Sequence, residues 1–158
     1  MPNTLASAVA AWLVSGAVFA QGIPGQILGD PSTERRGFRS YELAFVTPTD
    51  GVARSEFKSE TFYAVILETF PPCIDGEMQR RKVQALFPGN KVFATRFGCE
   101  GVVQENIDYT NVDPKWGFMA VYAGTTLAEG QELLEKVRRT TRFRNPSLRQ
   151  MQAILVYP

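Results

Sequence analysis

The sequence Phe62-Tyr-Ala-Val-Ile-Leu-Glu-Thr69 recurs 56 residues later as Phe118-Met-Ala-Val-Tyr-Ala-Gly-Thr125, and four of the eight positions are identical. Each copy has the pattern of a strand and is followed by a helical stretch and then by a second apolar stretch. The helical stretches are 75–83 and 129–137, and the second apolar stretches are 91–97 and 151–157. A repeat of this kind indicates two copies of one structural unit. It predicts an α+β fold, the ferredoxin-like βαββαβ sandwich, in which two strand–helix–strand halves share one sheet and both helices cover one face.

The second helical stretch has the clearest helix signals. Thr126-Leu-Ala-Glu129 is a capping box, in which a hydroxyl and a carboxylate satisfy free backbone N–H groups reciprocally. An apolar face follows at the spacing i, i+3, i+4 and i+7, formed by Gly130, Leu133, Leu134 and Val137. This helix is expected to pack one side against the sheet.

Alternation along the two repeated strands assigns their side chains to two faces of the sheet. Val65, Leu67, Val121 and Ala123 then face the helices. The opposite face carries mostly large apolar or aromatic side chains: Phe62, Ala64, Ile66, Phe118, Ala120 and Tyr122. An exposed apolar patch of that kind normally marks an interface. Three interpretations stay open, namely that the chain's own residues 40–60 cover this face, that a partner or second copy covers it, or that its aromatic rings stack on sugars.

The first 20 residues have the pattern of a secretory signal peptide. Thr4 to Ala20 is mostly apolar and uncharged. The stretch ends Ala17-Val-Phe-Ala20, which places small or medium residues at positions −3 and −1 of a cleavage site before Gln21. The run is slightly short for a stable membrane span. We therefore predict a periplasmic or secreted protein, with no stable membrane span after cleavage of residues 1–20.

Two segments separate this signal from the main domain, which is predicted over 61–158. Residues 21–39 are rich in Gly, Pro and charge, and they predict a linker or surface arm. Residues 40–60 predict an accessory β-hairpin: Tyr41 to Val46 alternates, Thr47 to Gly51 is a turn cluster, and a weaker strand lies near Val52 to Phe57.

The chain has two cysteines, Cys73 and Cys99. In an exported protein an even number of cysteines most simply indicates a disulfide. A metal pair and a reactive thiol are the other interpretations, but two thiolates without histidine make a poor zinc site, and the spacing differs from Cys-x-x-Cys. Closing a loop of this length stabilises a fold by roughly 3 kcal/mol in the chain-entropy model.

Composition excludes several classes of function. The chain has no histidine, so it lacks the commonest general base and the commonest zinc ligand. Its formal net charge is only +1, which gives no strong overall attraction to nucleic acid. No nucleophile elbow, phosphate-binding loop or dinucleotide fingerprint occurs. We therefore expect no enzyme, no cofactor, no metal and no nucleic-acid partner.

The two halves resemble a sporulation-related repeat (SPOR) domain over Thr61 to Tyr157. Val65-Ile-Leu-Glu-Thr-Phe70 resembles the opening strand of that family, and Val121-Tyr-Ala-Gly-Thr125 with residues 129–138 resembles its second strand and helix. The resemblance implies a cell-envelope module that binds peptidoglycan glycan strands through the sheet face not covered by helices. The candidate ligand-binding residues are Ile66, Phe118 and Tyr122 on that face, and Glu68, which stands where the first half of the family has a turn glycine.

These observations together predict an exported, non-enzymatic binding domain with peptidoglycan glycan as its favoured ligand. The alternative is a structural subunit of an envelope or extracellular assembly. Such a subunit would dock on an envelope protein partner, or on a second copy in an oligomer, through the apolar sheet face.

Overall fold

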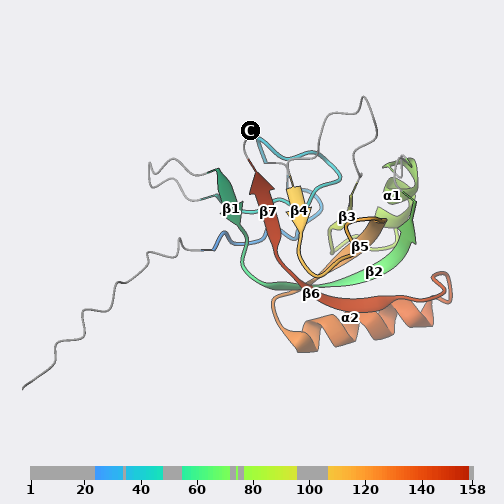
Figure 1. Cartoon of the computed structure of the whole chain (residues 1–158). Coiled ribbons are helices and arrows are strands. Elements are labelled where there is room, and N and C mark those ends of the chain that lie inside the picture. Colours follow the sequence, from blue (N-terminus) through green and yellow to red (C-terminus); the bar gives the residue numbers. More distant parts are fainter. Residues whose placement is uncertain are drawn as a thin grey trace, which may run out of the picture.

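The computed structural model describes residues 24–33, 35–47, 55–71, 74, 77–95 and 107–156. Within these residues the chain is an α+β protein with two helices and two antiparallel sheets (Figure 1). The elements are β1 (Glu56–Lys58), β2 (Phe62–Phe70), α1 (Glu77–Gln84), β3 (Val92–Ala94), β4 (Ile107–Tyr109), β5 (Gly117–Gly124), α2 (Leu127–Arg139), β6 (Ser147–Met151) and β7 (Ala153–Val156).

The larger sheet contains the two repeated strands, β2 and β5, as its central pair, in the order β3-β5-β2-β6. All three pairings are antiparallel, so β2 and β3 run parallel with β5 between them. The helices α1 and α2 follow β2 and β5 in the chain, as the repeat predicts.

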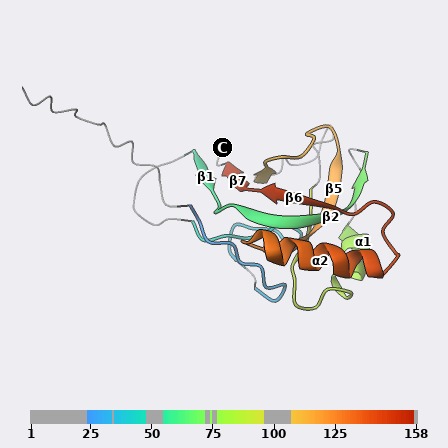
Figure 2. The same cartoon turned by 90° about the horizontal axis from the view of Figure 1, so that it is seen from below.

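Both helices cover one face of this sheet, as Figure 2 shows for α2. Val83 of α1 and Leu133 and Val137 of α2 are buried against strand residues that include Val65 and Val121. The start of α2 is the predicted capping box: the Glu129 backbone N–H donates to the Thr126 hydroxyl, and the Thr126 N–H donates to the Glu129 carboxylate from 2.9 Å. The apolar stripe of α2 thus faces the side that the sequence predicts.

The smaller sheet combines strands that are far apart in the sequence, in the order β1-β7-β4. Its central strand, β7, continues from β6 after Gln152, so the last strand of the chain passes from one sheet to the other. Side-chain and backbone hydrogen bonds hold this junction: the Gln152 N–H donates to the Thr110 hydroxyl from 2.8 Å, and the Gln152 amide donates to the Ser59 carbonyl from 3.1 Å. The predicted single strand over 151–157 is therefore two strands in two sheets, and the first of them begins earlier, at Ser147.

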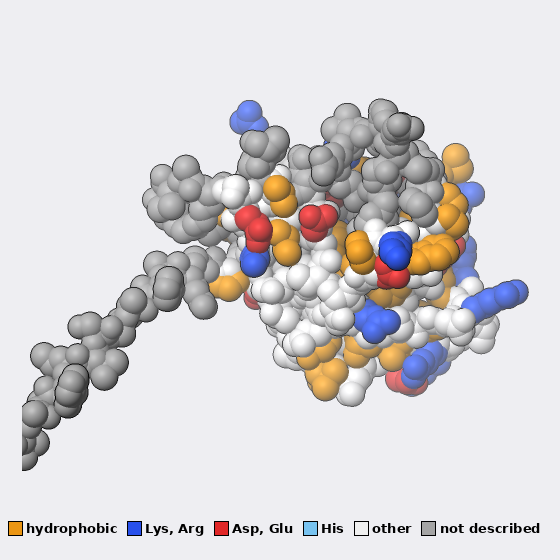
Figure 3. Space-filling view, viewed as in Figure 1, with side chains coloured by type: hydrophobic (Ala, Val, Ile, Leu, Met, Phe, Trp, Pro, Cys, Tyr) orange, Lys and Arg blue, Asp and Glu red, His pale blue; other side chains and the backbone are white. Residues whose placement is uncertain are grey.

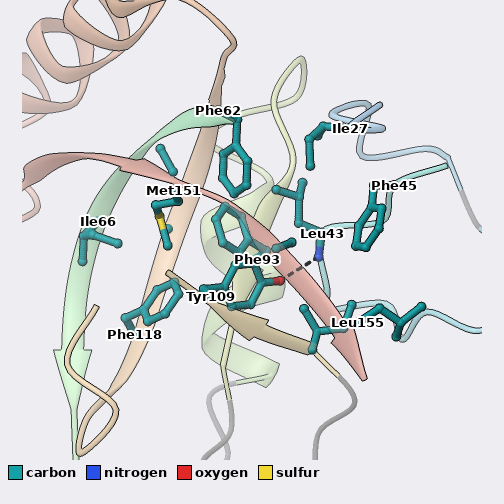
Figure 4. Close-up of a cluster of buried hydrophobic side chains, with 14 residues drawn as sticks. Ile27, Leu43, Phe45, Phe62, Ile66, Phe93, Tyr109, Phe118, Met151 and Leu155 are labelled. Atoms are coloured by element: carbon teal, nitrogen blue, oxygen red, sulfur yellow. Dashed lines mark hydrogen bonds between the residues drawn. The ribbon is translucent and has the colours of Figure 1, made fainter. Parts of the chain in front are cut away.

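The chain itself covers most of the second face of the larger sheet (Figure 4). The alternation predicted for this face is confirmed: Phe62, Ala64, Ile66, Phe118 and Ala120 share one buried cluster. The residues that cover them are Ile27, Leu43, Phe45, Ile107, Tyr109 and Leu155. The Leu43 N–H donates to the Tyr109 hydroxyl from 3.1 Å, which ties the N-terminal segment to β4. Of the three interpretations of this face, the structure favours cover by the chain, so the face is core over most of its area.

The covering segments pair differently from the predicted hairpin. Phe45 forms an isolated bridge with Ile27, and β1 pairs with β7 rather than with residues 41–46. The predicted arm 21–39 also contributes to the core, because Ile27 is buried. Apolar residues of both segments enter the core through long-range contacts that local alternation does not reveal.

Three predictions fall on residues outside the described ranges. They are the signal peptide over 1–20, the disulfide between Cys73 and Cys99, and the part of the accessory hairpin over 48–54. All three stay predictions from the sequence.

Candidate functional site

A cleft of about 490 Å³ opens at the end of the larger sheet, on the face that the covering segments bury elsewhere. Its floor is formed by Ile66 of β2 and Phe118 of β5. Thr69, Ser147 and Arg149 line it from the strands, and Asn111, Val112, Asp113 and Trp116 line it from the connection between β4 and β5. An apolar floor with a few polar groups around it is the usual composition of a small-ligand site.

The connection from Thr110 to Trp116 forms the wall of this cleft. Asn111 has a left-handed backbone with φ of 59°, a conformation that Asn tolerates better than most residues, and its side-chain amide donates to the Gln150 carbonyl from 3.2 Å. The Asp113 carboxylate accepts from the Lys115 N–H at 2.9 Å, and the Trp116 N–H donates to the Asp113 carbonyl from 3.2 Å. The turn at 113–116 is therefore fixed by its own hydrogen bonds, and β6 anchors its start.

Trp116 is the most distinctive side chain in the cleft, because its indole is large and 47% exposed. The next residue, Gly117, lies opposite Phe70, and a Cβ on it would lie 2.2 Å from the Phe70 ring. The Phe70 ring therefore fills the space beside the backbone that carries Trp116. An exposed indole on a fixed turn offers a flat apolar surface with one N–H donor at its edge.

Ile66 and Phe118, two of the predicted ligand-binding residues, meet in this cleft, but only as its floor. They are 6% and 2% exposed, respectively. They shape the bottom of the cleft and offer a ligand very little surface.

Glu68, the third candidate, follows a β-bulge in β2. Ile66 pairs with Ala120, but Glu68 pairs with Met119, so Leu67 is an extra residue in β2. Directly opposed residues share a face, and Met119 lies in the cluster under the helices. Glu68 is thus turned to the helix side, whereas Thr69, which lies opposite Phe118, lines the cleft.

Tyr122, the fourth predicted residue, lies outside this cleft. Its ring packs 5.8 Å from the ring of Phe62, centroid to centroid, and a Cβ on Gly29 would lie 2.2 Å from its Cε1 atom. Burial, followed by the negative charges of Glu60 and Glu129, raises the pKa of the Tyr122 hydroxyl above its ordinary value. Tyr122 therefore packs under the N-terminal segment and is not an open stacking platform.

A second, smaller cleft of about 390 Å³ adjoins the first across Ile66, Thr69 and Ser147. Glu68, Arg142, Phe143, Arg144 and Asn145 line it from β2 and the loop before β6. Basic side chains gather around this loop at the right of Figure 3. The two clefts together give an elongated surface with Trp116 in one and arginines in the other.

Comparison with known proteins finds no match: no family model, no curated protein and no solved structure matches this chain. Among the residues that the structure describes, no group of acidic, histidine or cysteine side chains is arranged to hold a metal ion. In the same residues no helix is long and apolar enough to cross a membrane.

Sequence reasoning missed Trp116 and Asn111. Both lie in the long connection before β5, which carries no periodic pattern. One signal could have identified Trp116. A tryptophan stands directly before a strand of the repeat, in the turn sequence Asp113-Pro-Lys-Trp116-Gly, and tryptophan is a residue type that is enriched at interfaces.

Proposed function

We propose that this chain is a non-catalytic binding domain that recognises a glycan strand in the Trp116 cleft, with peptidoglycan glycan as the favoured ligand. The observation that carries the proposal is the exposed indole of Trp116 above an apolar floor and beside hydrogen-bonding side chains. Sugars have apolar C–H faces and hydroxyl edges. A surface complementary to a sugar therefore has an aromatic ring that packs against the C–H faces and polar groups that form hydrogen bonds with the hydroxyl edges.

The polar lining of the cleft contains both donors and acceptors. Arg149 is a donor only, Asp113 accepts when ionised, and Asn111 can do both. Sugar hydroxyls donate and accept, so this mixture can bind several of them. The adjoining arginine-lined cleft makes the surface long enough to favour a strand over a single sugar.

Two features support a ferredoxin-like βαββαβ sandwich of the SPOR kind within this α+β fold. They are the sheet order β3-β5-β2-β6 and the helices that follow β2 and β5. We infer that the smaller sheet and the N-terminal segment are additions to that sandwich. Because these additions cover most of the open sheet face, the proposed ligand site is displaced to the uncovered end. An exported location, periplasmic or secreted, belongs to the same proposal and rests on residues 1–20.

The test uses Trp116 as its own reporter. The chain has two tryptophans, Trp12 and Trp116, so a Trp12→Phe variant leaves one emitter in the cleft. Soluble peptidoglycan glycan fragments are titrated into this variant while tryptophan fluorescence is followed. In parallel the chain is co-sedimented with sacculi, with and without prior removal of the stem peptides.

The proposal expects saturable quenching or a blue shift of Trp116 emission, and sedimentation that increases when stem peptides are removed. Trp116→Ala should weaken binding to sacculi by about tenfold or more, the usual effect of truncating a central aromatic contact. Leu127→Ala is the control, because Leu127 is an apolar residue of similar exposure, 50%, on α2. Equal binding by the wild type and by Trp116→Ala would refute the site. Absence of binding to both kinds of sacculi would refute the function.

A further inference from the structure

A separate cleft of about 440 Å³ lies between residues 31–33 and 35–44 on one side and α1 and Lys91 on the other. Among the described residues, most of the charged side chains that line this cleft are positive: Arg35, Arg36, Arg39, Arg80 and Lys91. These five cations come from three parts of the chain, so the fold brings them together and no single charge run in the sequence predicts them. None of them lines the Trp116 cleft.

Two of these cations are fixed in the base of the cleft. Arg80 is buried, donates Nε to the Glu77 carboxylate from 2.7 Å, and donates Nη1 to the Val92 carbonyl from 3.1 Å. Lys91 is buried as well, and its Nζ donates to the Ser40 carbonyl from 2.8 Å. Charged groups held in place in a region of low dielectric attract an opposite charge more strongly than the same groups in water.

Glu42 is the one carboxylate that lines this cleft among the described residues, and it is 4% exposed. Its Oε2 accepts from the Arg39 N–H at 2.6 Å, but its Oε1 has no hydrogen-bond partner. Burial raises the pKa of Glu42, although the Arg39 N–H and charge act in the other direction. Burial therefore disfavours the charged form of the one carboxyl group in this described lining.

We propose that this cleft is an anion site that binds the phosphate group of a phosphate ester. Lys91 supplies a fixed positive charge at the base, Arg80 is held beside it by its ion pair with Glu77, and Arg35 and Arg36 lie at the more accessible side. The guanidinium groups of Arg35 and Arg36 can form paired hydrogen bonds with two oxygens of one phosphate, which a lysine-rich patch cannot do. A phosphate ester also carries up to two negative charges, which suits a site lined by several cations better than a single carboxylate does.

Inorganic phosphate, titrated into the full chain and followed by calorimetry at constant ionic strength, tests the site. The double variant Arg35→Gln/Arg36→Gln should raise the Kd for phosphate by about tenfold or more, since a hydrogen bond to a charged group contributes roughly 1.5–3 kcal/mol. The matched control is Arg138→Gln/Arg139→Gln, which removes two adjacent arginines from α2 and should change the Kd less than twofold. Trp116→Ala should leave phosphate binding unchanged, so this site and the proposed glycan site can fail separately.

Three results would overturn the proposal: no saturable binding of phosphate, equal weakening by both double variants, or acetate binding as tightly as phosphate. Two further arms identify the source of the phosphate group. Competition by glycerol 3-phosphate without sedimentation on phosphatidylglycerol vesicles supports a soluble ester. Sedimentation on those vesicles, reduced by Arg35→Gln/Arg36→Gln and absent with phosphatidylcholine alone, supports a lipid headgroup.

Discussion

Phe45→Ala tests whether the N-terminal segment is part of the core or a detachable cover. Phe45 is fully buried, and its ring packs against Phe38 with centroids 5.3 Å apart. Truncation removes roughly 150 Å² of buried apolar area, and at about 25 cal/mol per Å² this corresponds to about 4 kcal/mol. Measured Phe→Ala substitutions in cores fall in the same range, about 3–5 kcal/mol. We therefore expect the free energy of unfolding to fall by about 4 kcal/mol.

Urea unfolding followed by circular dichroism measures this change. With a typical slope of about 2 kcal/mol per molar urea, the midpoint should fall by about 2 M in a single cooperative transition. Val46→Ala is the control, because Val46 is the next residue and is 37% exposed; its effect should stay within about 0.5 kcal/mol. If Phe45→Ala unfolds at the wild-type midpoint, or exposes an apolar surface while the sheet stays folded, the segment is a detachable cover and our account of the core is wrong.

Two smaller changes test the helix α1 and the turn beside the cleft. The hydrogen bond from Arg80, reinforced by Arg81, lowers the pKa of Glu77 from 4.5 to about 2. The charged carboxylate therefore stabilises the fold fully above about pH 4.5. This stabilisation is lost as the pH falls toward 2. Acid titration of stability should show a decline in that window that Glu77→Gln removes, with about 1–3 kcal/mol involved after allowance for solvent screening. Gly117→Ala would place a Cβ 2.2 Å from the Phe70 ring, so thermal unfolding should show a loss of about 1–3 kcal/mol; an unchanged Tm would mean that Phe70 moves aside freely.

The elements that local patterns specify are those that the sequence predicts well. The repeat at Phe62 and Phe118 identifies the central strands of the larger sheet, and the capping box at Thr126 marks the start of α2. Alternation along β2 correctly separates the helix-facing residues from the opposite face as far as Leu67. These features depend on neighbours in the chain, on hydrogen-bond capping and on strand period, all of which are visible in a short window of sequence.

The features that the sequence does not predict depend on contacts between distant residues. The bulge at Leu67 changes the face of Glu68, and nothing in the local pattern marks the extra residue. The passage of the last strand from one sheet to the other at Gln152 depends on Ser59 and Thr110, which are 93 and 42 residues away. The pairing of β1 is missed for the same reason, because its partner is β7 at the other end of the chain.

The covered face and the open cleft are consequences of one arrangement. The connection that carries Trp116 leaves β4, and β4 is held in place by β7, which also holds β1. The segments that bury Phe62 and Ala120 therefore also hold the connection that forms the wall of the cleft. The end of the same sheet face stays open at Ile66 and Phe118. A variant that loosened the cover would be expected to misplace the cleft wall as well. If the ligand binds at Trp116 as proposed, variants that destabilise the covering segments should also weaken ligand binding. If the ligand instead bound the bare sheet face, the same variants would uncover more of its binding surface.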